Sequence, residues 1–88
     1  MGSFEVLFKQ SVAKDLRRIP NKDVARILKR IEALSVEPRP PGVEKLSGQE
    51  KYRIRQGVYR ILYEIRDNEL IVMVIKVGHR REVYRSFV

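Results

Sequence analysis

The N-terminal part of the chain changes from a two-residue repeat of apolar side chains to a helical one. Between Phe4 and Lys9 apolar residues recur at every second position, which predicts a short strand, partly buried on both faces. From Val12 to Ile19 they return at helical spacing, and Pro20 then ends the segment. We expect Ser11 to cap this helix, because its hydroxyl can accept a hydrogen bond from a free backbone N–H of the first turn.

A second helix is predicted to begin directly afterwards, with Asn21 as its cap and Leu34 near its end. Its apolar residues form one stripe and its basic residues lie mostly on the other sides, as in a helix packed against a core. The stripe consists of Val24, Ile27, Leu28, Ile31 and Leu34. Three prolines and two glycines then mark a loop from about Glu37 to Glu50.

Three strands are predicted in the second half of the chain, at Lys51–Arg55, Val58–Arg66 and Glu69–Val77. Short turns at Gln56-Gly57 and Asp67-Asn68 would connect them as an antiparallel meander. The last strand is apolar on both faces, which is typical of an interior strand. The order β-α-α-β-β-β predicts an α+β fold, in which a helical hairpin packs on one face of a mainly antiparallel four-stranded sheet. The opposite face is then available for function.

Composition narrows the class of protein without fixing its activity. The chain of 88 residues can support one compact domain, 1–88, and its 43% of hydrophobic residues suffice for a core without metal or disulfide help. Cysteine is absent, which excludes disulfide frameworks, thiolate nucleophiles and cysteine zinc sites. No apolar run is long enough to span a bilayer and the N-terminus lacks a secretory pattern, so we expect a soluble, cytoplasmic protein.

The charge of the chain points to a polyanionic partner. Nineteen Lys and Arg residues exceed eleven Asp and Glu residues, which gives a formal net charge of +8. Twelve of the basic residues are Arg, and residues 51–88 hold nine basic against four acidic side chains. Because the planar guanidinium matches phosphate oxygens and stacks on bases, this bias favours phosphate recognition over a solubilising coat.

The strand at Lys51–Arg55 places two of these arginines together. Side chains alternate along a strand, so Arg53 and Arg55 point to one face and the residues between them to the other. Arg60, beyond the next turn, shares that face only if the pairing register allows it. The alternative is an exposed polar face in which Arg60 pairs with a neighbour such as Glu64.

A polar tail follows the last predicted strand, beginning where Gly78 permits a change of direction. Cleaving RNA by transesterification requires a group that deprotonates the 2′-hydroxyl, cations for the charged phosphorane and an acid for the departing oxygen. The tail contains residue types for all three tasks. They are His79, Arg80, Arg81, Tyr84 and Arg85.

Ordinary structural roles for these residues, and the absence of known catalytic motifs, limit what this tail implies. A lone histidine such as His79 is often a surface residue, and it excludes a metal site built on histidines. Tyr84 can equally anchor the chain end by packing, and we assign the other tyrosines mainly to the core. Gly-rich phosphate loops, nucleophile elbows, zinc-protease helices and usefully spaced carboxylate pairs are absent, so ordinary hydrolase classes are not expected.

Several ordered sequence blocks extend along nearly the whole chain. The most specific are Tyr-Arg-x-Arg from Tyr52, Tyr-Arg-x-x-Tyr from Tyr59 and Val-Gly-His-Arg-x-x-x-Tyr from Val77, and Ala13–Leu16 and Pro38–Val43 belong to the same pattern. Together these blocks resemble the RelE-type toxins of the RelE/ParE superfamily. The resemblance implies the toxin of a type II toxin–antitoxin pair, and the RelE branch cuts mRNA in the ribosomal A site.

The resemblance also implies roles for individual residues. In the RelE branch a 2′-oxygen attacks the adjacent phosphate and leaves a 2′,3′-cyclic end without a metal. Arg60 and Arg80 would stabilise the transition state or leaving group, Tyr84 would stack on or activate the nucleotide, and His79 is a further catalytic candidate. The residues expected to bind RNA phosphates are Arg53, Arg55, Arg81 and Arg85.

Two departures from the familiar pattern affect proton transfer. Related toxins often carry Lys where this chain has Arg53 and Arg55, and a guanidinium stays protonated, so the role of these two residues would be electrostatic. His79 stands where a basic residue often lies, and an imidazole can gain or lose a proton near neutral pH.

The expected partners are mRNA on a 70S-type ribosome and an acidic, RelB-like antitoxin that wraps the toxin. No metal, small-molecule cofactor or membrane is expected. Two other functions stay open: a ParE-like toxin that shares the fold but poisons DNA gyrase, and a non-catalytic RNA- or ribosome-binding protein whose positive face only holds phosphates. The arginine set with Tyr84 favours the nuclease, because a gyrase poison has no need of it.

Overall fold

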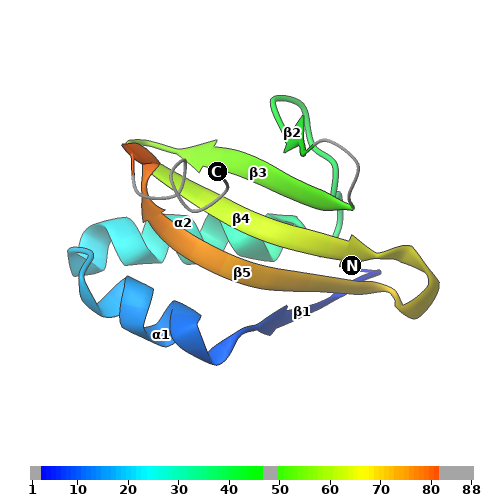
Figure 1. Cartoon of the computed structure of the whole chain (residues 1–88), viewed down its shortest axis with the longest axis horizontal. Coiled ribbons are helices and arrows are strands. Elements are labelled where there is room, and N and C mark those ends of the chain that lie inside the picture. The colour runs from blue at the N-terminus through cyan, green and yellow to red at the C-terminus, as the bar shows by residue number, and fades with distance from the viewer. Residues whose placement is uncertain (1–2, 47–49, 82–88) are drawn as a thin grey trace.

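The computed structural model of the protein describes residues 3–46 and 50–81, which form two helices and a five-stranded sheet (Figure 1). In chain order the elements are β1 (Glu5–Phe8), α1 (Gln10–Arg17), α2 (Asn21–Ala33), β2 (Glu44–Lys45), β3 (Lys51–Gln56), β4 (Tyr59–Arg66), a 3-10 turn (Asp67–Glu69) and β5 (Ile71–His79). The predicted α+β fold and the order β-α-α-β-β-β are confirmed, with one additional short strand.

The strands lie in the order β1-β5-β4-β3-β2. β1 pairs with β5 in parallel and all other neighbours are antiparallel, so the sheet is mainly antiparallel as predicted. β5 is an interior strand, which its apolar sequence indicated. The register between β4 and β5 shifts between Leu62 and Tyr63. This shift brings Val72 and Val74 onto the buried face together with Val77, although an unbroken alternation would separate them.

β2 lies within the segment that was predicted to be a loop, and it makes the sheet five-stranded instead of four-stranded. Glu44 pairs with Arg53 and Lys45 with Tyr52, both on β3. Two exposed charged residues carry no apolar alternation, so no sequence pattern marks this strand. Pairing with β3 alone defines it.

Both helices begin earlier than predicted, α1 by two residues and α2 by one. α1 begins at Gln10 with Lys9 as the preceding cap residue, where Ser11 was expected, and α2 begins at Asn21 itself, with Pro20 before it. The N–H of Lys9 donates to Val74 O on β5 at 3.0 Å, so pairing of the chain with β5 continues up to the helix. The carbonyl of Pro20 accepts hydrogen bonds from the first turn of α2, which leaves no capping task for the Asn21 side chain.

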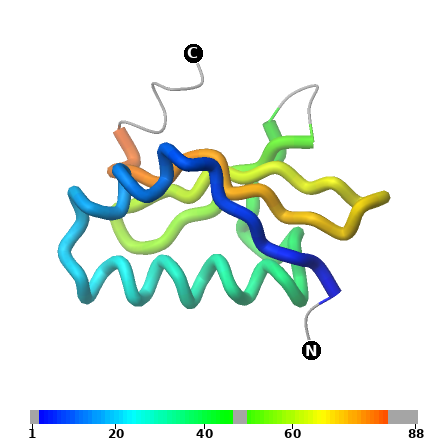
Figure 2. Tube along the Cα trace, turned by 90° about the horizontal axis from the view of Figure 1, so that it is seen from below, coloured from blue at the N-terminus to red at the C-terminus, as the bar shows by residue number. Residues whose placement is uncertain are grey.

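The two helices lie differently against the sheet (Figure 2). α2 runs along one face, whereas α1 flanks the side of β5 beyond the end of β1. Within residues 3–46 and 50–81, neither helix is long and apolar enough to cross a membrane. On α2 the predicted apolar stripe is buried at Ile27, Ile31 and Leu34, but Leu28 at its margin is 40% exposed.

The core fills the space between the helices and the sheet and includes two stacked tyrosines. Tyr52 and Tyr63 lie opposite each other on β3 and β4, with ring centroids 5.8 Å apart, and both are buried, as predicted for the core. The Tyr63 hydroxyl donates to Pro38 O at 2.7 Å. Arg39 donates to both carboxylate oxygens of Asp67, at 3.1 and 2.8 Å, and to the Tyr52 hydroxyl at 3.0 Å. These contacts fix the proline-rich segment that leads into β2.

Replacing Tyr63 by Phe should destabilise the protein by about 1–2 kcal/mol, because the buried Pro38 carbonyl loses its hydrogen-bond donor while the ring still fills its site. Urea unfolding measures the loss. Tyr59→Phe is the matched control, since the half-buried Tyr59 hydroxyl makes no hydrogen bond within the described residues and should change stability by less than about 0.5 kcal/mol. Equal losses in the two variants would contradict this account.

Candidate nucleic-acid interface

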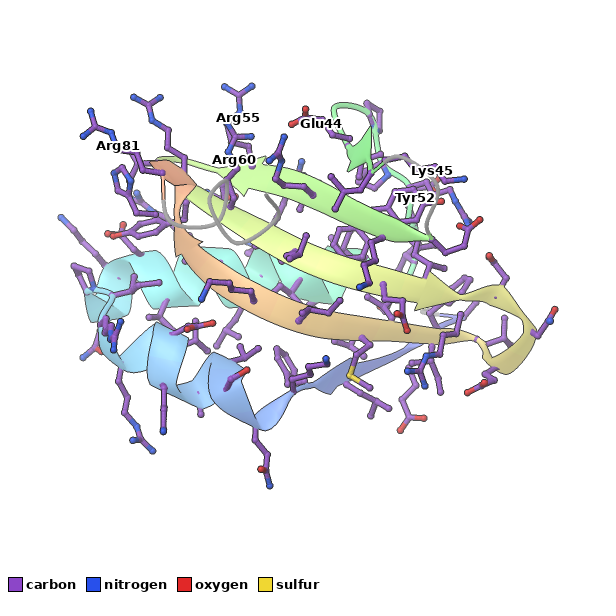
Figure 3. All side chains as sticks on the ribbon, in the orientation of Figure 1. Glu44, Lys45, Tyr52, Arg55, Arg60 and Arg81 are labelled. Carbon is purple, nitrogen blue, oxygen red and sulfur yellow. The ribbon has the colours of Figure 1, made fainter. Side chains whose placement is uncertain are left out.

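Three arginines lie together on the sheet face that points away from α2. Arg55 on β3 is directly opposite Arg60 on β4, so the two share a face, and Arg53 shares it by alternation along β3. We call this surface the arginine face: Arg53, Arg55 and Arg60. Figure 3 shows Arg55 and Arg60 at one end of the sheet. The pairing register between β3 and β4 therefore brings Arg60 to the same face as Arg53 and Arg55, which alternation alone could not establish.

A direct Arg55–Arg60 pair is unfavourable by itself, because like charges opposite each other in a sheet repel. Arg55 is exposed and makes no ion pair within residues 3–46 and 50–81. Arg60, in contrast, pairs with Glu44 and not with Glu64, whose carboxylate accepts a hydrogen bond from Arg66 at 2.7 Å. Arg60 is thus paired with a neighbouring carboxylate, as in the polar-face alternative, but its partner is Glu44 and not Glu64.

Glu44 on β2 is the counter-ion of the arginine face. Its two carboxylate oxygens accept hydrogen bonds from different arginines, Oε2 from Arg53 Nη2 at 3.2 Å and Oε1 from Arg60 Nη1 at 3.3 Å. The carboxylate is turned toward the arginines in Figure 3. The hydrogen bond from Arg53, together with the charges of Arg53, Arg60 and Arg55, holds the pKa of this carboxyl below its ordinary value. Sequence reasoning missed Glu44, because it lies in a segment read as loop.

The arginines differ in how firmly they are held. The side chains of Arg53 and Arg60 are only 11% and 17% exposed, whereas that of Glu44 is 53% exposed. Arg60 Nε is buried without a hydrogen-bond partner in the described part of the chain. Burying a polar N–H without a partner costs free energy, so a ligand that satisfies this group would be favoured. Arg53 and Arg60 thus form a fixed pair of cations, and Arg55 is a free one beside them.

The end of β5 brings His79, Arg80 and Arg81 to the end of the sheet where Arg55 and Arg60 lie. Gly78 pairs with Arg60, and β5 continues through His79 instead of turning at Gly78 as predicted. His79 lies opposite Tyr59 on the face that α2 covers, so alternation separates it from the arginine face. The N–H of Arg80 donates to Val58 O at 2.9 Å, which fixes where the chain leaves the sheet.

Of the other predicted tail residues, the structure describes only Arg81. Arg81 is exposed, its N–H donates to His79 Nδ1 at 3.3 Å, and Figure 3 shows its side chain at the same end of the sheet as Arg55. Tyr84 and Arg85 lie outside the described residues.

Asp15 on α1 anchors the end of β5. β1 stops at Phe8, so β5 has an open edge beyond that point. Asp15 Oδ2 accepts a hydrogen bond from the N–H of Val77 at 3.1 Å, and Oδ1 lies 3.7 Å from Lys76 Nζ. A helix side chain thus replaces the missing strand partner and holds the part of β5 that leads to Arg80.

Comparison with known proteins assigns the family. Residues 6–84 match the family model of the ParE toxin of type II toxin–antitoxin systems, parDE. Toxin RelG of Mycobacterium tuberculosis is 31% identical over 93% of this chain and 97% of its own length, and toxin RelE3 of Methanocaldococcus jannaschii is 33% identical over 94% and 98%. The chain belongs to the RelE-type toxins of this family.

A solved relative has the same architecture as this RelE-type toxin. The crystal structure of the archaeal RelE–RelB complex from Pyrococcus horikoshii OT3 contains a chain that is 28% identical to it. The two superpose with a TM-score of 0.80 over 89% of this chain and 96% of that one. The resemblance inferred from the ordered sequence blocks is confirmed.

The Glu44 ion pairs should make stability depend on pH in one direction. Because the folded-state pKa is lowered, the contribution of Glu44 is present above its unfolded pKa of about 4.3 and is lost as the pH falls through the folded value. Urea unfolding from pH 7 to pH 3 should show Glu44→Gln less stable at neutral pH by at most about 1 kcal/mol, with the difference closing in acid. Glu32→Gln, away from the arginine face, is the control for losing one carboxylate. A difference that persists unchanged at pH 3 would exclude the ionic origin.

Proposed function

We propose that this type II toxin acts as a ribosome-dependent endoribonuclease that cuts A-site mRNA by 2′-hydroxyl transesterification without a metal. Residues 1–88 would form a single toxin domain. The observation that supports this most is the arginine face, where two fixed guanidiniums and a free one lie together despite their mutual repulsion. Clustered cations are the feature that a pentavalent phosphorane, with its additional negative charge, requires.

The arginine face would work by electrostatics. Guanidiniums stay protonated, so Arg53 and Arg55 would hold phosphates of the mRNA strand, and Arg60 and Arg80 would stabilise the transition state or the leaving oxygen. Arg81 and Arg85 would add phosphate contacts. Proton transfer is left to groups that titrate, for which Tyr84 and His79 are the candidates from the tail. The position of His79 on the α2-covered face argues for a role at the end of the sheet and against direct contact with the arginine face.

Glu44 would exchange places with the substrate. A carboxylate and a phosphodiester both accept hydrogen bonds from guanidinium forks, so an mRNA phosphate can replace the carboxylate between Arg53 and Arg60. The half-exposed Glu44 side chain is free to rotate into solvent. In the absence of RNA, Glu44 therefore keeps the two guanidiniums in position and reduces their repulsion.

An acidic antitoxin is the proposed protein partner. The Pyrococcus relative was solved as a complex with RelB, and a net charge of +8 would attract an acidic chain. Action on ribosomes would place the toxin in the cytoplasm.

Poisoning of DNA gyrase is the second candidate function, because the matching family model is described as a ParE toxin. A protein that only binds its target needs a complementary surface but no cluster of cations for a phosphorane. The arginine face therefore favours the nuclease.

Adding purified toxin to a translating bacterial extract should produce mRNA fragments with 2′,3′-cyclic phosphate ends at A-site codons. Arg60→Gln and Arg80→Gln should each lower the cleavage rate by about 10²–10³-fold, as expected for removal of one group that stabilises the transition state. Lys14→Gln, an exposed cation on α1, is the charge-matched control and should cut at the wild-type rate.

The same extract separates the alternatives. Full activity in an Arg60→Gln/Arg80→Gln double variant would refute the residue assignment. Gyrase-dependent DNA breaks with intact mRNA would favour the ParE-like function, and salt-sensitive ribosome binding without cleavage would favour a non-catalytic binder.

A further inference from the structure

A second basic surface lies on the helical side of the molecule, between α2 and the end of β3. It is a pocket of about 320 Å³ that shares the lining residues Arg26 and Gln56 with a second pocket of about 200 Å³ beside the β3–β4 turn, where Asp23 also lies. Gln56 lies two residues after the buried Ile54 on β3, so the two side chains share the face opposite the arginine face. We call the larger pocket the α2 groove; it is lined by Arg26, Lys29, Arg30, Ala33 and Gln56.

The basic side chains that line the α2 groove have no ion-pair partners within the described residues. Among the described residues, its lining contains three basic side chains and no carboxylate. None of Arg26, Lys29 and Arg30 forms an ion pair or side-chain hydrogen bond within residues 3–46 and 50–81, and Arg30 Nε is buried without a hydrogen-bond partner. Like charges one helical turn apart, as at Arg26 and Arg30, destabilise an isolated helix by about 0.2–0.5 kcal/mol. The groove is therefore suited to an anionic ligand that would satisfy these groups.

The lining favours a phosphate backbone over an acidic peptide. Protein partners are held mainly by apolar and aromatic side chains that enter pockets, yet Ala33 is the only apolar residue that lines the groove within residues 3–46 and 50–81. Guanidinium forks match phosphate oxygens, and the Gln56 amide can donate a further hydrogen bond. Cations that repeat along one side of a helix also suit a strand with one negative charge per nucleotide.

We propose that the α2 groove binds the phosphodiester backbone of ribosomal RNA, as a second RNA contact on the side of the sheet opposite the arginine face. This inference rests on the proposed function, in which the arginine face is occupied by the mRNA strand. The toxin then holds its substrate on one face and the surrounding ribosomal RNA on the other. Affinity for the ribosome and the rate of cutting are carried by different residues.

The test measures binding to purified small ribosomal subunits without mRNA, using fluorescently labelled toxin over a series of salt concentrations. Arg26→Gln/Arg30→Gln should bind about tenfold more weakly, and the slope of log affinity against log salt should become shallower by about 1.4–1.8, since each lost contact accounts for about 0.7–0.9. Lys9→Gln/Lys14→Gln removes two exposed cations away from the groove and should keep the wild-type slope. Arg26→Lys/Arg30→Lys keeps both charges and should also retain the slope.

Several results would overturn the proposal: a wild-type toxin that does not bind the subunits, equal losses in the groove and control pairs, or weakened binding of a poly-glutamate peptide with unchanged subunit binding. Thermal unfolding of each variant verifies that it is folded. Loss of subunit binding in the groove pair, together with failure of the wild-type toxin to cut mRNA, would support the groove and refute the nuclease. If the wild-type toxin cuts mRNA but Arg26→Gln/Arg30→Gln binds the subunits normally, the nuclease is supported and the groove is refuted.

Discussion

The register between β3 and β4 is the constraint on which the rest of the structure depends. Tyr52 and Ile54 on β3 lie opposite Tyr63 and Ile61 on β4, and all four side chains are buried against the helical side. A slip by one residue would turn them to solvent and direct charged side chains into the core. The hydrophobic core thus determines where the guanidiniums lie, and it holds the arginine face together although its charges repel.

Much of the fold was predictable because burial imposes a period on the sequence. A strand or helix with one covered face must repeat its apolar residues every two or every three to four positions, and β1, β3, β4 and both helices carry these patterns, whereas β5 is marked by a continuous apolar run. β2 carries none, since Glu44 and Lys45 are exposed and the strand is defined by its pairing with β3. The parallel pairing of β1 with β5 and the register shift in β5 are likewise products of tertiary packing, which no local period encodes.

The candidate site, like the fold, was predictable only where a local sequence pattern determines it. That Arg53 and Arg55 share a face follows from alternation alone, but placing Arg60 with them required the register. Glu44 was beyond reach, because its partners lie nine and sixteen residues further along the chain and nothing near it distinguishes it from other loop carboxylates. His79 is the converse case: its sequence neighbourhood groups it with the arginines, while alternation along β5 turns it to the other side of the sheet.

The arginines of this basic protein differ in what they contact, and their contacts separate structural roles from roles on the arginine face. Arg39 is used for structure, bound to both oxygens of Asp67 and stacked over the Tyr52 ring at 5.3 Å. Arg53 and Arg60 share one half-exposed carboxylate, which limits their repulsion in the free protein yet can be displaced at low cost because solvent screens it. One carboxylate cannot neutralise three guanidiniums, so the face retains a net positive charge that a strand with several phosphates balances better. A buried acidic partner would have neutralised the arginines permanently; the exposed Glu44 leaves them positioned but available.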